Sequence, residues 1–117
     1  MNLPRLACCN FLPDVRQLRD FAQTYGFAGV DWTFSDPEFP LHPSAARQIQ
    51  EAVRVLAPLS VRYHCAFPQI DLGDDDPKQA EAAARIFQAV CRLVAAANGR
   101  YLTVHIGLGR DSTLDLG

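Results

Sequence analysis

Two histidines are the residues in this chain whose type and position are best suited to chemistry. His64 lies near the end of the apolar segment 61–65, and His105 lies near the end of the segment 101–107. Each segment is short and rich in β-branched and aromatic residues, which is typical of a buried strand in a parallel sheet. Parallel sheets bind ligands at the carboxyl ends of their strands. We therefore expect both imidazoles in one site, where they could ligate a metal or move a proton.

Alternate positions along four strand-like segments separate polar from apolar side chains. Successive side chains of a strand point to opposite faces, so such segments build a sheet with two different surfaces. The expected apolar face collects Ala7, Cys9, Ala28, Val30, Trp32, Val61, Tyr63, Cys65, Leu102, Val104 and Ile106. The expected polar face collects Cys8, Asn10, Gly29, Asp31, Thr33, Arg62, His64, Tyr101, Thr103 and His105.

Helical patterns separate these strands and must position them. Apolar residues recur at three- and four-residue spacings over residues 13–25, 44–57 and 77–97. Ser44 and Asp76 are expected to be the N-caps of the second and third helices. Strands that alternate with helices of this length predict right-handed crossovers and a parallel βαβαβαβ sheet.

The single polar face distinguishes between the parallel α/β folds. A doubly wound sheet carries helices on both faces, whereas a barrel is apolar on its outer face and polar inside its catalytic end. We therefore expect a (β/α)₈ TIM barrel. A complete barrel takes about 200–250 residues. This chain has 117 residues, so residues 1–117 are expected to form one domain, the first half of a barrel truncated from a longer parent. The alternative is a homo-oligomer whose copies cover the open sheet.

Composition excludes several classes of protein. With 11 Lys and Arg against 13 Asp and Glu, the chain has no basic excess that would bind nucleic acid or a membrane surface non-specifically. No apolar run reaches the roughly 20 residues of a membrane-spanning helix, and no signal peptide is evident. The 4 cysteines match neither a metal-binding spacing nor a disulfide framework. We expect a cytoplasmic protein with reduced cysteines.

Three short motifs carry a family resemblance. They are Gly26-Phe27-Ala28-Gly29-Val30-Asp31, Tyr63-His64 with Ile70-Asp71-Leu72-Gly73, and Thr103-Val104-His105-Ile106-Gly107. In this order and spacing the chain resembles the N-terminal half of the xylose isomerase-like TIM-barrel superfamily, which includes sugar phosphate isomerases and epimerases and endonuclease IV-type nucleases. The resemblance implies that His64 and His105 lie in or beside a divalent-metal site.

The resemblance also implies which residues carry the function. His64 and His105 would ligate Zn, Mn, Mg or Co in the full-length parent, and the remaining ligands, on later strands, would lie beyond Gly117. The expected catalytic residues are Asp31, His64 and His105, with Asp31 ligating the ion or orienting His64. The expected substrate-binding residues are Asn10, Trp32 and Arg62.

Two of these residues have alternative roles. Arg62 lies on the same expected face as Asp31, so it either pairs with that carboxylate or contacts an anionic group of the substrate, and the ion pair is favoured. Trp32 either stacks on a sugar or packs against the loop that follows its strand.

Three functions remain open at this point. The first is a metal-assisted isomerase or epimerase acting on a small sugar or sugar phosphate, with proton transfer by carboxylates or imidazoles. The second is a metal-dependent phosphodiester hydrolase of the endonuclease IV type, which predicts basic residues at the catalytic mouth. The loops over residues 35–43 and 67–76 are acidic or neutral, which disfavours it. The third is a non-catalytic half-barrel that oligomerises.

Overall fold

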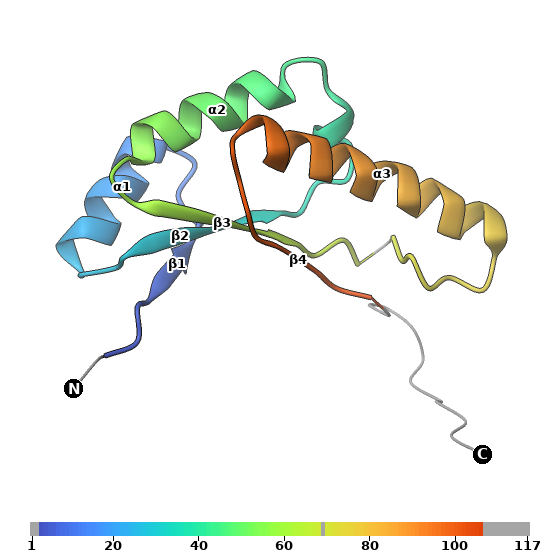
Figure 1. Cartoon of the computed structure of the whole chain (residues 1–117), viewed down its shortest axis with the longest axis horizontal. Coiled ribbons are helices and arrows are strands. Elements are labelled where there is room, and N and C mark those ends of the chain that lie inside the picture. The colour runs from blue at the N-terminus through green and yellow to red at the C-terminus, as the bar shows by residue number, and fades with distance from the viewer. Residues whose placement is uncertain (1–2, 69, 107–117) are drawn as a thin grey trace.

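The computed structural model describes residues 3–68 and 70–106, and within them strands alternate with helices. The fourth strand, expected to reach Gly107, ends earlier, and Gly107 lies outside the described residues. The elements are β1 (Ala7–Cys9), α1 (Val15–Thr24), β2 (Gly29–Phe34), the short 3₁₀ helix η1 (Phe39–Leu41), α2 (Ala45–Leu56), β3 (Ser60–Cys65), α3 (Pro77–Ala96) and β4 (Leu102–Val104) (Figure 1).

The strands in the described part of the chain form one parallel sheet of 4 strands in the order β1-β2-β3-β4. Each strand therefore pairs with its neighbours in sequence, and β1 and β4 are the two edges. The register places Thr33 beside His64, and His64 beside Thr103. The predicted parallel βαβαβαβ order is confirmed.

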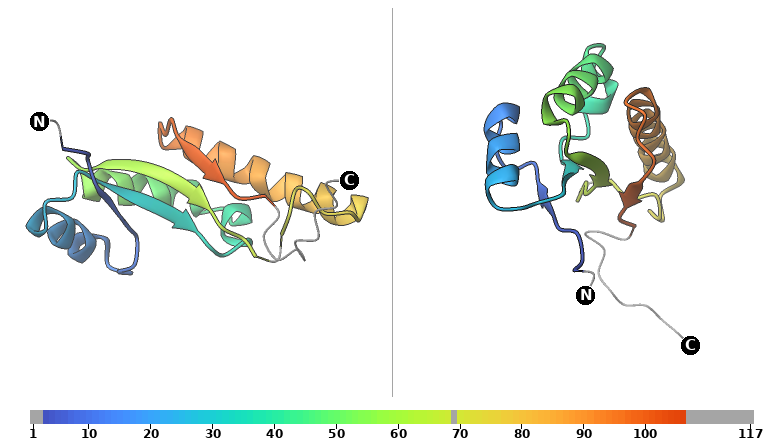
Figure 2. Two further views of the ribbon diagram at one scale, coloured as in Figure 1. Left: turned by 90° about the horizontal axis from the view of Figure 1, so that it is seen from below. Right: turned by 60° about the vertical axis from the view of Figure 1, so that its left-hand side comes forward.

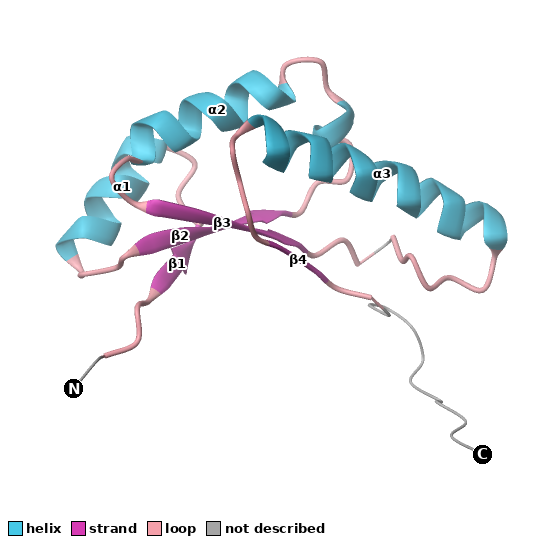
Figure 3. Ribbon diagram, in the orientation of Figure 1, coloured by secondary structure: helices cyan, strands magenta, loops and turns pink. Residues whose placement is uncertain are grey.

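All three α-helices cover the same face of this sheet. Figure 2 shows α1, α2 and α3 side by side above the strands, and Figure 3 shows the same separation of cyan helices from magenta strands. Within the described residues no helix covers the opposite face, which agrees with the expected barrel geometry. None of the helices described has the length and apolarity needed to cross a membrane.

The core lies between the helices and the sheet in two clusters. Strand side chains from the helix-facing positions enter both, and the rings of Tyr63 and Phe34 stack with their centroids 5.9 Å apart. Burial of these apolar side chains provides most of the favourable free energy of folding. The larger cluster includes Phe34, Ile49, Tyr63, Cys65, Phe67, Phe87 and Val90. The smaller one contains Cys8, Leu18, Ala22, Val30 and Leu56.

Aspartates begin two of the helices that cover the sheet. The Asp14 carboxylate accepts two backbone N–H bonds from the first turn of α1, at 2.9 and 3.2 Å. Asp76 accepts one from Lys78 at 3.0 Å, as its predicted role as N-cap requires. Ser44 occupies the N-cap position of α2 without capping the backbone. Its hydroxyl oxygen instead accepts a hydrogen bond from the Gln48 side chain at 2.7 Å.

The faces of β1 are opposite to those expected. Cys8 is 9% exposed and packs with Leu18 and Ala22 on the helix side, whereas Ala7 and Cys9 are exposed on the other side. The assignment of Cys8 to the polar face is therefore wrong. The sequence Ala-Cys-Cys has no alternation of apolar and polar residues, so its pattern could not determine which residues face the helices.

Candidate functional site

Two imidazoles meet at the carboxyl end of the sheet. His64 is the last residue but one of β3, and His105 directly follows β4. Their Nε2 atoms lie 2.5 Å apart, and the rings meet edge to face with centroids 4.6 Å apart. The parallel register of β3 and β4 brings the two residues together on the face that the helices leave open.

Thr33 contacts the other nitrogen of His64. Its Oγ1 lies 3.3 Å from Nδ1 of His64, which is its neighbour in register on the adjacent strand. If Nε2 of His64 binds a metal, the ring proton is on Nδ1, and this N–H donates to the Thr33 hydroxyl oxygen. Without a metal, one of the two facing Nε2 atoms carries a hydrogen and the other accepts it. Sequence reasoning missed this role of Thr33, although the register with His64 would have revealed it.

The donor atoms fit part of a metal site. Two imidazoles provide two of the four ligands that a tetrahedral Zn²⁺ takes, and such an ion holds its nitrogen ligands about 3.3 Å apart. The His64 and His105 Nε2 atoms, 2.5 Å apart, would separate by roughly 0.8 Å to share it. Among the described residues no group of three or more His, Cys, Asp or Glu side chains could hold an ion. A complete site therefore needs donors in addition to these two.

Asp31 and Arg62 are neighbours in register but form no ion pair within 4.0 Å in the described chain. The guanidinium carbon of Arg62 lies 4.8 Å from the centroid of the Tyr101 ring instead. The favoured ion pair is therefore wrong. An aromatic face attracts the guanidinium while leaving much of it hydrated, which avoids the desolvation penalty of a buried ion pair. At Nδ1 of His64 the structure places the Thr33 hydroxyl, and the expected catalytic role of Asp31 stays a prediction.

Asn10 joins the end of β1 to β2. Its Oδ1 accepts a hydrogen bond from the Thr33 backbone N–H at 2.8 Å, and its Nδ2 donates to the Thr33 carbonyl oxygen at 3.4 Å. Both polar groups of the side chain therefore bond to the residue that contacts His64. This geometry assigns Asn10 to positioning Thr33, and its expected contact with substrate stays a prediction.

Trp32 lies on the side of β2 opposite the histidines. It packs against both core clusters together with the helix-facing side chains of the sheet. It also lines a cavity of about 190 Å³ at the end of β2, with Ser35, Asp36 and Phe39. The structure therefore does not bring the indole to the imidazole pair, and its expected substrate contact stays a prediction.

Cys65, although next to His64 in sequence, is not part of the pair. Its side chain is fully buried in the larger cluster, and this burial raises the pKa of the thiol to about 12. A thiol that keeps its proton at neutral pH is a poor nucleophile and a poor metal ligand. Cys65 therefore takes no part in the site formed by the imidazole pair and the Thr33 hydroxyl.

Comparison with known proteins supports the fold. No protein-family model matches the sequence, and no curated protein matches it. Among solved structures, the chain is similar to endonuclease IV from Thermus thermophilus, with a TM-score of 0.60 and 18% sequence identity. The match covers 92% of this chain and 42% of that chain. The chain therefore has the fold of part of a (β/α)₈ TIM barrel, and its match spans less than half of the endonuclease IV chain.

Proposed function

We propose that this chain forms the first half of a (β/α)₈ barrel enzyme whose catalytic centre is built around His64 and His105. The observation that carries this proposal is the 2.5 Å approach of their Nε2 atoms at the carboxyl end of the parallel sheet. The open face needs an opposite wall, because it carries the histidines and the edges β1 and β4 each lack a partner on one side in the described chain. We assign this wall to further strands of a longer parent, and the alternative is further copies of this chain.

The proposed reaction is an isomerisation or epimerisation of a sugar or sugar phosphate. His64 and His105 would hold a divalent ion, Zn, Mn, Mg or Co, which polarises a carbonyl and its neighbouring hydroxyl when bound. With the ion on Nε2, the Thr33 hydroxyl oxygen would accept the hydrogen bond from the ring N–H at Nδ1 of His64. Asp31 lies two residues before Thr33 on the same face, so their Cα atoms are about 6.6 Å apart along the strand. Its carboxylate would take a proton from a substrate that extends along the open face to this residue.

Hydrolysis of a phosphodiester is the second candidate, and the likeness to endonuclease IV favours it. The charges at the carboxyl end of the sheet disfavour it. The loops over residues 35–43 and 66–76 contain Asp and Glu but no Lys or Arg. Proteins hold the phosphates of a nucleic acid largely with Lys and Arg. Isomerisation of a neutral sugar makes no such demand, because such a substrate needs only a few polar contacts.

Metal binding tests the site. Titration with Co²⁺, read by absorption, should show nitrogen ligation that is lost in His64→Ala and in His105→Ala. His42→Ala is the matched control, because His42 is exposed and its ring bonds to Ser44 instead of another histidine. Equal Co²⁺ binding by wild type and by the double variant of His64 and His105 would show that the ligand assignment is wrong.

The two reactions are separated by their products. Incubation of the completed barrel with sugars and sugar phosphates in D₂O should place deuterium next to the carbonyl carbon, detected by ¹H NMR. Cleavage of a duplex with an abasic site, without deuterium exchange in any sugar, would favour the hydrolase.

Light scattering after size-exclusion chromatography should show whether further copies complete the barrel. A stable monomer with no hydrophobic-dye binding would contradict the proposal that this sheet needs a second wall.

A further inference from the structure

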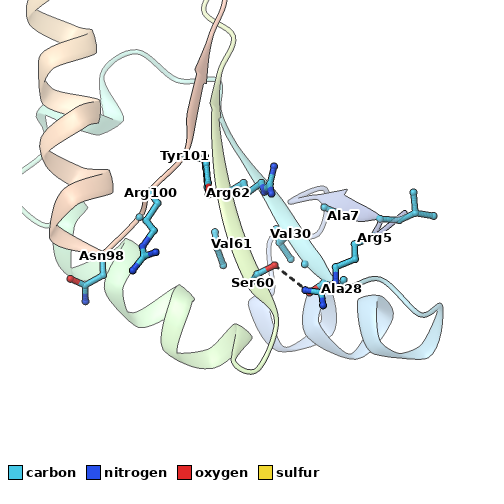
Figure 4. Close-up of a pocket in the computed structure, with 13 residues that line it drawn as sticks. Arg5, Ala7, Ala28, Val30, Ser60, Val61, Arg62, Asn98, Arg100 and Tyr101 are labelled. Carbon is cyan, nitrogen blue, oxygen red and sulfur yellow. Dashed lines mark hydrogen bonds between the residues drawn. The ribbon is translucent and has the colours of Figure 1, made fainter. Parts of the chain in front are cut away.

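A second cavity lies at the amino end of the sheet, opposite the end that carries the histidines (Figure 4). Its volume is about 460 Å³, which is within the usual range for small-molecule sites. Arg5 before β1, Arg62 on β3 and Arg100 before β4 line it, with Ser60 and Asn98 as neutral polar groups. No carboxylate lines this cavity among the described residues.

Within the part of the chain that the structure describes, no ion pair neutralises the three arginines. The ion pairs within 4.0 Å in the described chain involve other arginines, Arg19, Arg54 and Arg85. Arg62 lies over the Tyr101 ring, which leaves its positive charge uncompensated. Asp31 shares a neighbouring cavity with Arg62 but does not line this one. The cavity is therefore positively charged.

The helices offset only part of this charge. In this topology α1, α2 and α3 each run back to the amino end of the next strand, so their C-terminal ends lie at this end of the sheet. Each helix end corresponds to about half of a negative elementary charge, and three ends therefore balance about half of three guanidinium charges. The other half of the positive charge remains for an anion to neutralise.

The wall of the cavity is preformed where β2 and β3 approach closely. A Cβ added at Gly29 would clash with Oγ of Ser60 and lie 2.6 Å from its carbonyl oxygen. The Ser60 hydroxyl donates to the Ala28 carbonyl oxygen at 3.4 Å, as the dashed line in Figure 4 marks. The hydroxyl oxygen can still accept a hydrogen bond. Around this fixed wall the arginines come from three separate segments of the chain.

We propose that this cavity binds a phosphate monoester of a small molecule. The planar guanidinium group donates two parallel hydrogen bonds to a phosphate, and three such groups suit a dianion. The volume exceeds that of a phosphate ion, and the apolar residues Leu6, Ala7 and Val61 are among those that line the remaining space. The site lies at the other end of the strands from His64 and His105, so it does not depend on the proposed catalysis.

Titration of the chain with glycerol 3-phosphate at constant ionic strength tests this site, with glycerol and chloride as controls. Amide NMR shifts should saturate and concentrate at residues 5–7, 60–62 and 98–101. The double variant Arg62→Gln with Arg100→Gln should weaken binding at least tenfold. Arg47→Gln on α2, an exposed arginine outside the cavity, should bind as wild type does.

Three results would overturn the proposal. They are shifts that rise linearly without saturation, equal affinity of wild type and the double variant, and binding of inorganic phosphate as tight as that of glycerol 3-phosphate. If the double variant does not fold, Arg5→Gln and Arg100→Gln are made singly at exposed positions, and each should weaken binding at least threefold. His64→Ala should leave this binding unchanged, so failure of this site and failure of the proposed catalytic site are distinguishable.

Discussion

The two faces of the sheet differ in what they contribute to the protein. On β3, Tyr63 is 2% exposed and packs under the helices, whereas its neighbours Arg62 and His64 point to the open face. The helix-facing side chains hold the fold together, and the opposite ones carry the groups able to do chemistry. Substitutions on the two faces should therefore have separable effects, on stability and on binding.

The largest contrast is expected between adjacent residues of β3. Tyr63→Ala should lower the free energy of unfolding by about 3–5 kcal/mol, because it leaves a cavity in the core. Arg62→Ala should cost less than about 1 kcal/mol, since it removes only the contact with the Tyr101 ring. Urea denaturation of both variants measures the difference. Similar losses of unfolding free energy in the two variants would show that side chains on the open face also stabilise the fold.

The buried thiol should make stability depend on pH. Burial raises the pKa of Cys65 from 9.0 to about 12, so the folded state keeps a proton that the unfolded state loses. This contribution is complete below pH 9 and is lost as the pH rises toward 12. Between pH 8 and pH 10 the loss is on the order of 1 kcal/mol. Burial also raises the pKa of Tyr63, which acts in the same direction.

Urea denaturation across this pH range checks the effect of the thiol. Cys65→Ala should flatten the dependence, and Cys9→Ala, which removes an exposed thiol on the open face, should leave it as in wild type. An unchanged slope in Cys65→Ala would assign the pH effect to other groups.

One position on the open face should behave like the core. Gly29 is buried there, and an added methyl group would meet Ser60 on β3. Gly29→Ala should therefore cost about 1–3 kcal/mol through overpacking. Thr103→Ala, at an exposed position of the same face, should change stability by less than about 0.5 kcal/mol. If both variants unfold at the same urea concentration as wild type, the close approach of β2 and β3 is not rigid.

A smaller effect on stability than at Gly29 is expected at Thr33. Thr33→Val removes the hydroxyl next to Nδ1 of His64, which should cost about 0.5–1.5 kcal/mol. If His64 ligates a metal, affinity for Co²⁺ should fall about tenfold, because the ring loses the partner that orients it. Thr103→Val is the matched control. Equal affinity of the two variants for Co²⁺ would show that Thr33 does not contribute to the metal site.

The sequence was sufficient to place a residue where polar and apolar side chains alternate clearly along a strand, or where a residue has the type and neighbours of a helix N-cap. His64 and His105 were placed at the ends of parallel strands because segments 61–65 and 101–107 have a strong strand pattern. Asp76 was predicted as an N-cap because Pro77 follows it, and its carboxylate does cap α3. These signals are local, so they could be found without knowing what packs against them.

The errors came from contacts between distant segments. The pairing of Arg62 with Asp31 was wrong because Tyr101, 39 residues further along the chain, provides the ring that Arg62 covers. Ile106, expected to face the helices, is 68% exposed because β4 ends at Val104. A pattern of alternate residues gives the two faces of a strand but neither its last residue nor its neighbours in space.

The order of the strands has a consequence for how the protein is made. Since each strand pairs with the strands before and after it in sequence, every βα unit can dock onto the preceding one as it leaves the ribosome. Each pairing closes a single loop through the helix between the two strands, and no pairing within the described sheet waits for a strand beyond the next one. The growing sheet always presents its newest strand as the edge, ready to accept the next strand to be synthesised.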